Sequence, residues 1–185
     1  MELTATTTVT KPPQEVYGFW HRLENLATFM AHLDDVRVTG ATSSHWVASA
    51  PFDTVVEWDA VTTDDVAAER VAWASVKGAE VATSGEVLFV PAPGGRGTEV
   101  RVTLRYDMPA GPLGKAVAKY FGDDPSQALD DDLRRFKQVM ETGEVVRSEG
   151  APWGKRARKE FPQRPARPLS GEELQELRGR KEVLA

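Results

Sequence analysis

Residues 97–107 read GTEVRVTLRYD, and this stretch with the helical pattern after it decides the fold. Apolar and polar residues alternate along it, which is typical of a strand with one buried and one solvated face. Beyond a Pro/Gly turn, apolar residues recur at helical spacing in two segments: Leu113, Val117, Tyr120 and Phe121, then Leu129, Leu133, Phe136 and Met140. Gly122 and Pro125 separate the two segments. We therefore expect a long, interrupted helix whose apolar face covers a sheet.

A strand, two short helices and a series of strands are expected before this point. Residues 2–10 alternate as a strand does, and Pro12-Pro13 then start a helix that carries Val16, Phe19, Trp20 and Leu23. A second short helix is expected to carry Leu26, Phe29, Met30 and Leu33. Strand patterns bounded by turn residues, Asp64-Asp65 among them, then cover 36–40, 44–49, 54–61, 70–76, 85–91 and 98–107. The pattern predicts an α+β protein with an antiparallel sheet of about seven strands.

The 185 residues suffice for one domain and an appendage. Residues 1–146 hold 13 Lys/Arg against 22 Asp/Glu, and residues 147–185 hold 10 against 6, so the net charges are −9 and +4. An acidic body repels phosphate backbones, and no nucleic acid partner is expected for it. The basic, Pro/Arg-rich tail reads as a linker with a short helix at its end. This tail either contacts an acidic partner or an anionic surface, or folds back on the acidic body.

Chemistry that depends on cysteine is excluded, because the chain has none. The three histidines, His21, His32 and His45, lack the spacing of a metal site, and we expect neither a metal nor a cofactor. The chain shows neither a signal peptide pattern nor an apolar stretch long enough to span a membrane. A cytoplasmic protein is expected.

Several sequence segments, in this order, resemble the START/SRPBCC superfamily, and among its members the bacterial cyclase/dehydrase-like proteins. The segments are VYGFWHRLENLATFM (16–30), SHWVASAPFDTVVEWDA (44–60), ERVAWASV (69–76), GEVLFVPAPGGRGTEVRVTLRYDMPAG (85–111) and DLRRFKQVMETGE (132–144). The resemblance implies a helix-grip fold, in which a curved antiparallel sheet holds the C-terminal helix over an elongated, mainly apolar cavity. It does not imply one reaction, since this fold serves carriers, enzymes and sensors.

Tryptophans occur on three consecutive predicted strands. Alternation places Trp58 on the apolar side of its strand, away from Glu57 and Asp59. These rings either fill the core or line a cavity for a planar or hydrophobic ligand. The candidate ligand-binding residues are Trp46, Trp58, Trp73, Phe89, Leu104, Tyr106, Tyr120, Phe121, Leu133, Phe136 and Met140. Tyr106 and Tyr120 are the first candidates for orienting a ligand, and the helix break at residues 122–125 is the expected gate.

No residue is assigned a catalytic role. Glu57 and Asp59 share a strand face and in principle divide acid and base roles, but charges on the polar side of a strand are usually solvated. His45 is expected opposite Trp46, in solvent. The leading hypothesis is therefore a carrier of a hydrophobic or aromatic small molecule or lipid. The alternatives are a polyketide cyclase or dehydratase that uses the same cavity, and a protein-interaction module that acts through the basic tail.

Overall fold

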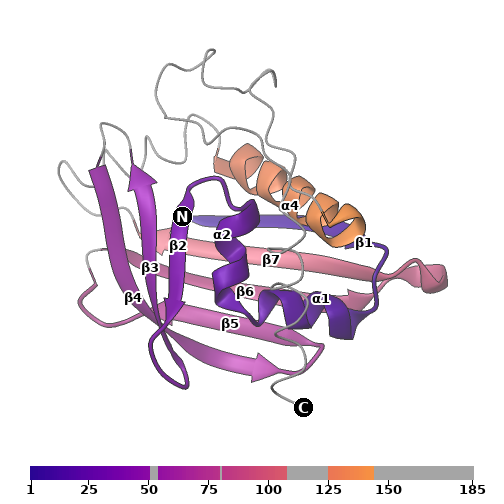
Figure 1. Cartoon of the computed structure of the whole chain (residues 1–185), viewed down its shortest axis with the longest axis horizontal. Helices are drawn as coiled ribbons and strands as arrows, with labels where there is room; N and C mark the ends of the chain where they lie inside the picture. Colours follow the sequence, from indigo (N-terminus) through magenta and orange to yellow (C-terminus); the bar gives the residue numbers. More distant parts are fainter. Residues whose placement is uncertain (51–53, 80, 108–124, 144–185) are drawn as a thin grey trace.

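A single antiparallel sheet of seven strands dominates the computed structural model, which describes residues 1–50, 54–79, 81–107 and 125–143 (Figure 1). The strands are β1 (Glu2–Val9), β2 (Leu33–Val38), β3 (Ser43–Ala50), β4 (Thr54–Val66), β5 (Arg70–Ser75), β6 (Ala82–Pro91) and β7 (Thr98–Asp107). The helices are α1 (Pro13–Trp20), α2 (Leu26–Phe29) and α4 (Pro125–Thr142), with 3₁₀ turns at Leu23–Asn25 and Pro93–Gly95. The strand order is β1-β7-β6-β5-β4-β3-β2. The predicted α+β, helix-grip fold is confirmed.

The sheet bends along β4, which is longer than its sequence pattern indicated. The prediction ended this strand at Val61 and took Asp64-Asp65 for a turn, and both were wrong. The first half of β4 pairs with β3, and the second half pairs with β5 up to Val66. A register shift between Thr62 and Asp64 joins the halves. Such a bulge breaks the alternation of side chains and bends the strand, so the sequence there reads as a turn.

The second helix is shorter than predicted, because Leu33 belongs to β2 and not to α2. The helix ends at Phe29, and Met30 already has the extended backbone that leads into the strand. Leu33 is buried all the same, 6% exposed, so its apolar character reports burial and not helical spacing. β2 itself contains a register shift between Leu33 and Asp35. β6 also begins earlier than predicted, at Ala82, which brings Thr83 and Ser84 into the sheet.

Helices cover the concave face of the sheet, and an aromatic cluster joins two of them. α1 packs against β5 and β6, while α4 lies across β1 and contacts α2 (Figure 1). The rings of Trp20, Phe29 and Phe136 meet with centroids 5.1–5.3 Å apart. All three side chains are at most 1% exposed. Because closely packed aromatic rings dominate core energetics, this cluster holds α4 against the rest of the fold.

Two charged residues of α4 fix the helix to the connection between α2 and β2. The Arg135 Nε donates to the Phe29 carbonyl at 2.7 Å, and the Ala31 amide donates to the Asp132 Oδ1 at 3.0 Å. Asp132 and Arg135 also form an ion pair with each other. The Arg135 guanidinium and the Asp132 carboxylate thus form hydrogen bonds with backbone groups that have no partner within α2, where that helix ends. These contacts set the height of the first half of α4 above the sheet.

The polar end of α1 is held by the second half of β4. The Tyr17 hydroxyl donates to the Asp65 Oδ1 at 2.7 Å, and the His21 Nε2 lies 2.9 Å from the Asp65 Oδ2. Burial raises the pKa of Tyr17, and the hydrogen bond to Asp65 raises it further. The phenol therefore stays protonated and donates across the neutral range.

Some expectations concern residues outside the described ranges. They are the first segment of the long helix with Tyr120 and Phe121, residues 122–124 of the expected gate, and the tail 147–185. The predicted second segment of the long helix is present as α4. The domain boundary at residue 146 stays a prediction. Among the helices of the described ranges, none is long and apolar enough to span a membrane.

Truncation of the central ring of the aromatic cluster provides a stability test. We expect Phe136→Ala to lower the free energy of unfolding by about 3–5 kcal/mol, because it removes a fully buried ring and leaves a cavity. Arg134→Ala, at an exposed position on the same helix, is the control and should cost at most about 1 kcal/mol. Urea unfolding measures both. Equal losses for the two variants would show that the cluster does not hold α4.

Candidate functional site

A cavity of about 120 Å³ lies between the sheet and the first half of α4. Every strand of the sheet contributes to its wall, and so do Ala128, Leu129 and Asp132 of α4. Most of the wall is apolar. The residues on the wall are Leu3, Met30, His32, Leu33, Trp46, Ala48, Val56, Trp58, Trp73, Val81, Thr83, Ser84, Leu104, Arg105, Tyr106, Ala128, Leu129 and Asp132.

Three tryptophans from adjacent strands form one side of the cavity as a stack, which we call the tryptophan stack (Trp46, Trp58 and Trp73). Trp46 lies in the middle, with both ring centroids 5.8 Å away and interplanar angles of 23° and 18°. Trp58 is the direct register partner of Trp46, whereas Trp73 lies on β5 and has Thr62 of β4 as its register partner. The Trp46 Nε1 donates to the Ser44 Oγ at 2.8 Å. The arrangement presents flat aromatic surface to the cavity.

Gly85 makes room for one ring of the stack. It is the register partner of Trp73 in the neighbouring strand β6. A Cβ added at residue 85 would lie 2.3 Å from the Trp73 Cζ2, far inside contact distance. A glycine within a strand often marks such a close approach. The position of the Trp73 indole therefore depends on the absence of a side chain at residue 85.

Two polar atoms of wall residues are buried without a hydrogen-bond partner in the described part of the chain. They are the Trp58 Nε1 and the Thr83 Oγ1. A buried donor or acceptor without a partner costs about 1–3 kcal/mol. The Trp20 Nε1 is in the same state, but Trp20 belongs to the aromatic cluster and not to the wall. Two of these unmet polar atoms thus belong to residues of one cavity.

Four titratable side chains also reach the wall. Asp132 accepts the Ala31 amide and pairs with Arg135. Arg105 donates to the Glu2 carboxylate at 2.6 Å. The Tyr106 hydroxyl donates to the Met1 sulfur, and burial raises the pKa of Tyr106. His32 is the fourth titratable wall residue.

Sequence reasoning did not select His32, Thr83, Ser84 or Asp132. Asp132 could have been found, because it lies three residues after Leu129 and so shares the apolar stripe of the helix. Thr83 and Ser84 were missed because the predicted strand began at Gly85. His32 lies in a short connection to which neither the alternation of a strand nor the spacing of a helix applies.

Five of the predicted site residues lie on the cavity wall: Trp46, Trp58, Trp73, Leu104 and Tyr106. Four others pack elsewhere in the core, namely Phe89, Leu133, Phe136 and Met140. Phe89 lies beneath α1, where its ring meets Tyr17 edge to face, and Phe136 belongs to the aromatic cluster. Tyr120 and Phe121 lie outside the described residues. The cause of the difference is that α1 and α4 fill one end of the concave face and leave the other end open.

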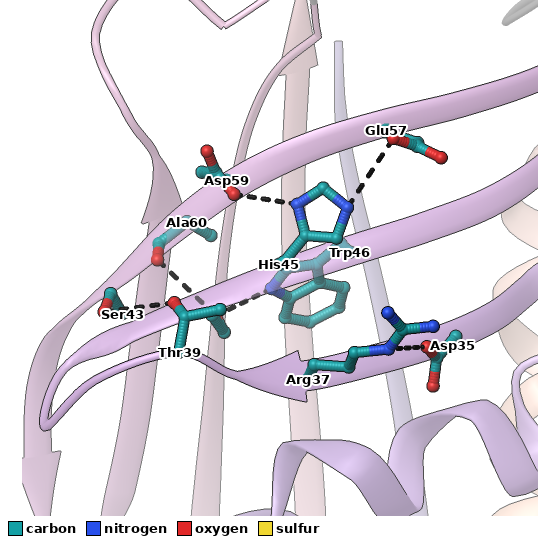
Figure 2. A network of polar contacts seen from close by, with 10 residues as sticks. Asp35, Arg37, Thr39, Ser43, His45, Trp46, Glu57, Asp59 and Ala60 are labelled. Carbon is teal, nitrogen blue, oxygen red and sulfur yellow. Dashed lines mark hydrogen bonds and ion pairs between the residues drawn. The ribbon is translucent and has the colours of Figure 1, made fainter.

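The acidic pair Glu57 and Asp59 lies on the opposite face of the sheet from the tryptophan stack. Figure 2 shows His45 between the two carboxylates, with its Nδ1 2.8 Å from the Asp59 Oδ1 and its Nε2 3.7 Å from the Glu57 Oε2. The His45 side chain is 30% exposed, so it is less solvated than the sequence indicated. These three groups do not face the cavity. Within the described residues, no cluster of three or more His, Asp or Glu is arranged to hold a metal ion.

Comparisons with known proteins agree with this architecture. A family model described as "Polyketide cyclase / dehydrase and lipid transport" matches residues 9–134. The crystal structure of DR_A0006 from Deinococcus radiodurans is similar with a TM-score of 0.65 and 40% identity, over 77% of this chain and 98% of that one. An uncharacterized 17.2 kDa protein of Streptomyces lincolnensis is 29% identical over 130 residues, 70% of this chain and 83% of its own length.

An aromatase/cyclase, Zhui from Streptomyces sp. R1128, shares the fold. Its structure has a TM-score of 0.57 and 13% identity, over 77% of this chain and 97% of that one. At this identity the likeness concerns the fold alone.

Adding a methyl group at residue 85 tests the dependence of the tryptophan stack on Gly85. We expect Gly85→Ala to displace the Trp73 ring, to alter the near-ultraviolet circular dichroism of the stacked indoles, and to cost about 1–3 kcal/mol of stability. Gly18→Ala is the control, since residue 18 is helical and nothing lies within 4 Å of its added Cβ. This control should leave the spectrum unchanged. An unchanged spectrum in Gly85→Ala would contradict the close approach of Trp73.

Proposed function

The chain belongs to the polyketide cyclase/dehydrase and lipid transport family, and we propose that it binds a hydrophobic or aromatic small molecule or a lipid in the cavity beneath α4. The observation that carries the proposal is the tryptophan stack on an otherwise mainly apolar wall. Ligand sites are typically concave and apolar with a few polar groups at fixed places, and this wall fits that description.

The volume of the cavity limits how large a part of a ligand can be enclosed in it. An apolar cavity of roughly 150 Å³ holds a benzene molecule, and this cavity measures about 120 Å³. The cavity is therefore slightly smaller than that, and of the order of one aromatic ring or a short alkyl segment. Burial of about 150–250 Å² of aromatic surface corresponds to about 4–6 kcal/mol before the costs of association. Apolar burial supplies the affinity, and the polar atoms of the wall supply orientation.

Catalysis in the same cavity is the second candidate, of the polyketide cyclase or dehydratase type. The observation in its favour is that His32 and Asp132 reach the wall, which gives the cavity groups able to move protons. Asp132, however, already accepts the Ala31 amide and pairs with Arg135, an arrangement that suits a structural role. We therefore place binding before catalysis. The order would be reversed if the wild-type protein converted a ligand recovered from the host into a product of different mass and Asp132→Asn did not.

A role of residues 147–185 in contacting an acidic partner or an anionic surface remains a third hypothesis. It predicts that deletion of these residues abolishes the cellular function while ligand binding survives. Loss of ligand binding on the same deletion would contradict it.

Filling the cavity tests the binding proposal directly. We expect isopropylbenzene to change the tryptophan fluorescence of the wild type, because the tryptophan stack lies on the wall. Ala48→Phe places a new ring at a buried wall position and should abolish this response while keeping the fold. Ala82→Phe, which adds the same ring at an exposed strand position, is the matched control and should bind as the wild type does. Thermal unfolding checks the integrity of both variants.

Two results would contradict the binding proposal. One is a wild type that responds to no apolar or aromatic compound in this assay. The other is an equal response in Ala48→Phe, which would place the binding elsewhere. Native mass spectrometry of protein purified from its own host complements the assay, since a retained ligand identifies the natural compound.

A further inference from the structure

We propose that Trp58 and Thr83 are the polar anchors of the cavity and make it select a ligand that carries a neutral hydrogen-bond acceptor, a carbonyl or hydroxyl oxygen, beside its apolar part. This inference rests on the proposed binding function and narrows the class of ligand. It starts from the two buried polar atoms on the wall residues that have no partner within the described chain, the Trp58 Nε1 and the Thr83 Oγ1. Buried polar groups in native proteins nearly always have partners.

The two residues lie on the same face of the sheet. Alternation along β4 places Trp58 with the buried Val56 and Ala60, and along β6 it places Thr83 with the buried Gly85. Between them, Ser75 of β5 pairs with Ala60 and accepts a hydrogen bond from the Thr83 amide at 3.0 Å. The two unmet atoms are therefore carried by one side of the cavity, from strands separated only by β5.

The neighbouring groups leave these two atoms unsatisfied. The Ser44 hydroxyl accepts from the Trp46 Nε1 at 2.8 Å and donates to the Ala60 carbonyl at 3.5 Å, so its hydrogen bonds go to groups other than Trp58. An indole N–H is only a donor, while a threonine hydroxyl both donates and accepts. A single ligand oxygen that accepts from Trp58, or a carbonyl and hydroxyl pair that serves both residues, complements this set.

The charges on the wall favour a neutral acceptor over a carboxylate. Among the described wall residues, Arg105 alone carries a permanent positive charge, and the Glu2 carboxylate already engages it at 2.6 Å. Asp132 adds a negative charge to the wall, although Arg135 pairs with it. A ligand carboxylate would lose its hydration and meet no dedicated cation, which is costly in an apolar site. A ketone or an alcohol gives up far less hydration.

Three probes with the same number of non-hydrogen atoms separate these possibilities: isopropylbenzene, acetophenone and benzoate. Their affinities are measured by calorimetry for the wild type, Trp58→Phe and Thr83→Val. We expect Trp58→Phe to weaken acetophenone about five- to tenfold more than it weakens isopropylbenzene, because only acetophenone loses a net hydrogen bond, whereas both probes meet the same smaller ring. The ratio of the affinities of acetophenone and isopropylbenzene is compared between the variant and the wild type, because the different hydration of the two probes in water cancels in this comparison. Thr83→Val should shift this ratio in the same direction.

A matched control variant and a direct spectroscopic readout complement the measured affinity ratio. Trp46→Phe makes the same change in a ring whose N–H already has a partner, and it should not alter the ratio. In the wild type, acetophenone should shift the indole N–H resonance of Trp58, identified by its loss in Trp58→Phe, more than isopropylbenzene does. Once it is assigned, this resonance decides the matter even if Thr83→Val does not fold.

The failure of this proposal is distinguishable from that of the binding function. If isopropylbenzene and acetophenone both bind and neither Trp58→Phe nor Thr83→Val changes their ratio, the anchors are wrong while the binding function stands. Benzoate binding as tightly as acetophenone would overturn the requirement for a neutral group. If none of the probes binds the wild type, the binding function itself fails, and the anchors fail with it.

Discussion

The need to cover the concave face of a strongly bent sheet is the constraint on which the structure depends. Seven antiparallel strands expose one apolar face, and a sheet of this kind is stable only when another layer buries that face. α4 meets this need because its ring at Phe136 enters the cluster with Trp20 and Phe29. The Asp132 and Arg135 contacts then set the height of the helix. The cavity is the space that this fixed helix does not fill.

The concave face is consequently divided into a solid end and a hollow end. At the solid end, α1 and the second half of α4 bury phenylalanine and aliphatic side chains at close packing. At the hollow end, the wide indole rings stack on one another and line the space, with Gly85 admitting one of them. The same residue type therefore serves two purposes: Trp20 supports the fold, and the tryptophan stack faces the cavity. This division separates the side chains that stabilise the fold from those that line the cavity.

The sequence predicted the sheet, its strand count and the cover by α4, because alternation and helical spacing report which face of each element is apolar. It placed Trp58 on the apolar face of its strand for the same reason. It failed where a bulge broke the alternation in β4 and where Leu33 continued a helical spacing inside a strand. It could not separate Phe89 and Phe136 from true wall residues, since burial in packed core and burial beside a cavity leave the same pattern. Which polar atoms lack partners depends on three-dimensional contacts.

The irregular edge strand β2 has a consequence for the behaviour of the protein in concentrated solution. Among the described residues it ends the sheet on one side, and its outer edge offers backbone groups to which a strand from another molecule is able to add. The register shift between Leu33 and Asp35 twists this edge, and the paired charges of Asp35 and Arg37 lie along it. Both features hinder the addition of a further strand, so self-association through the growing sheet is disfavoured without any cost to the interior.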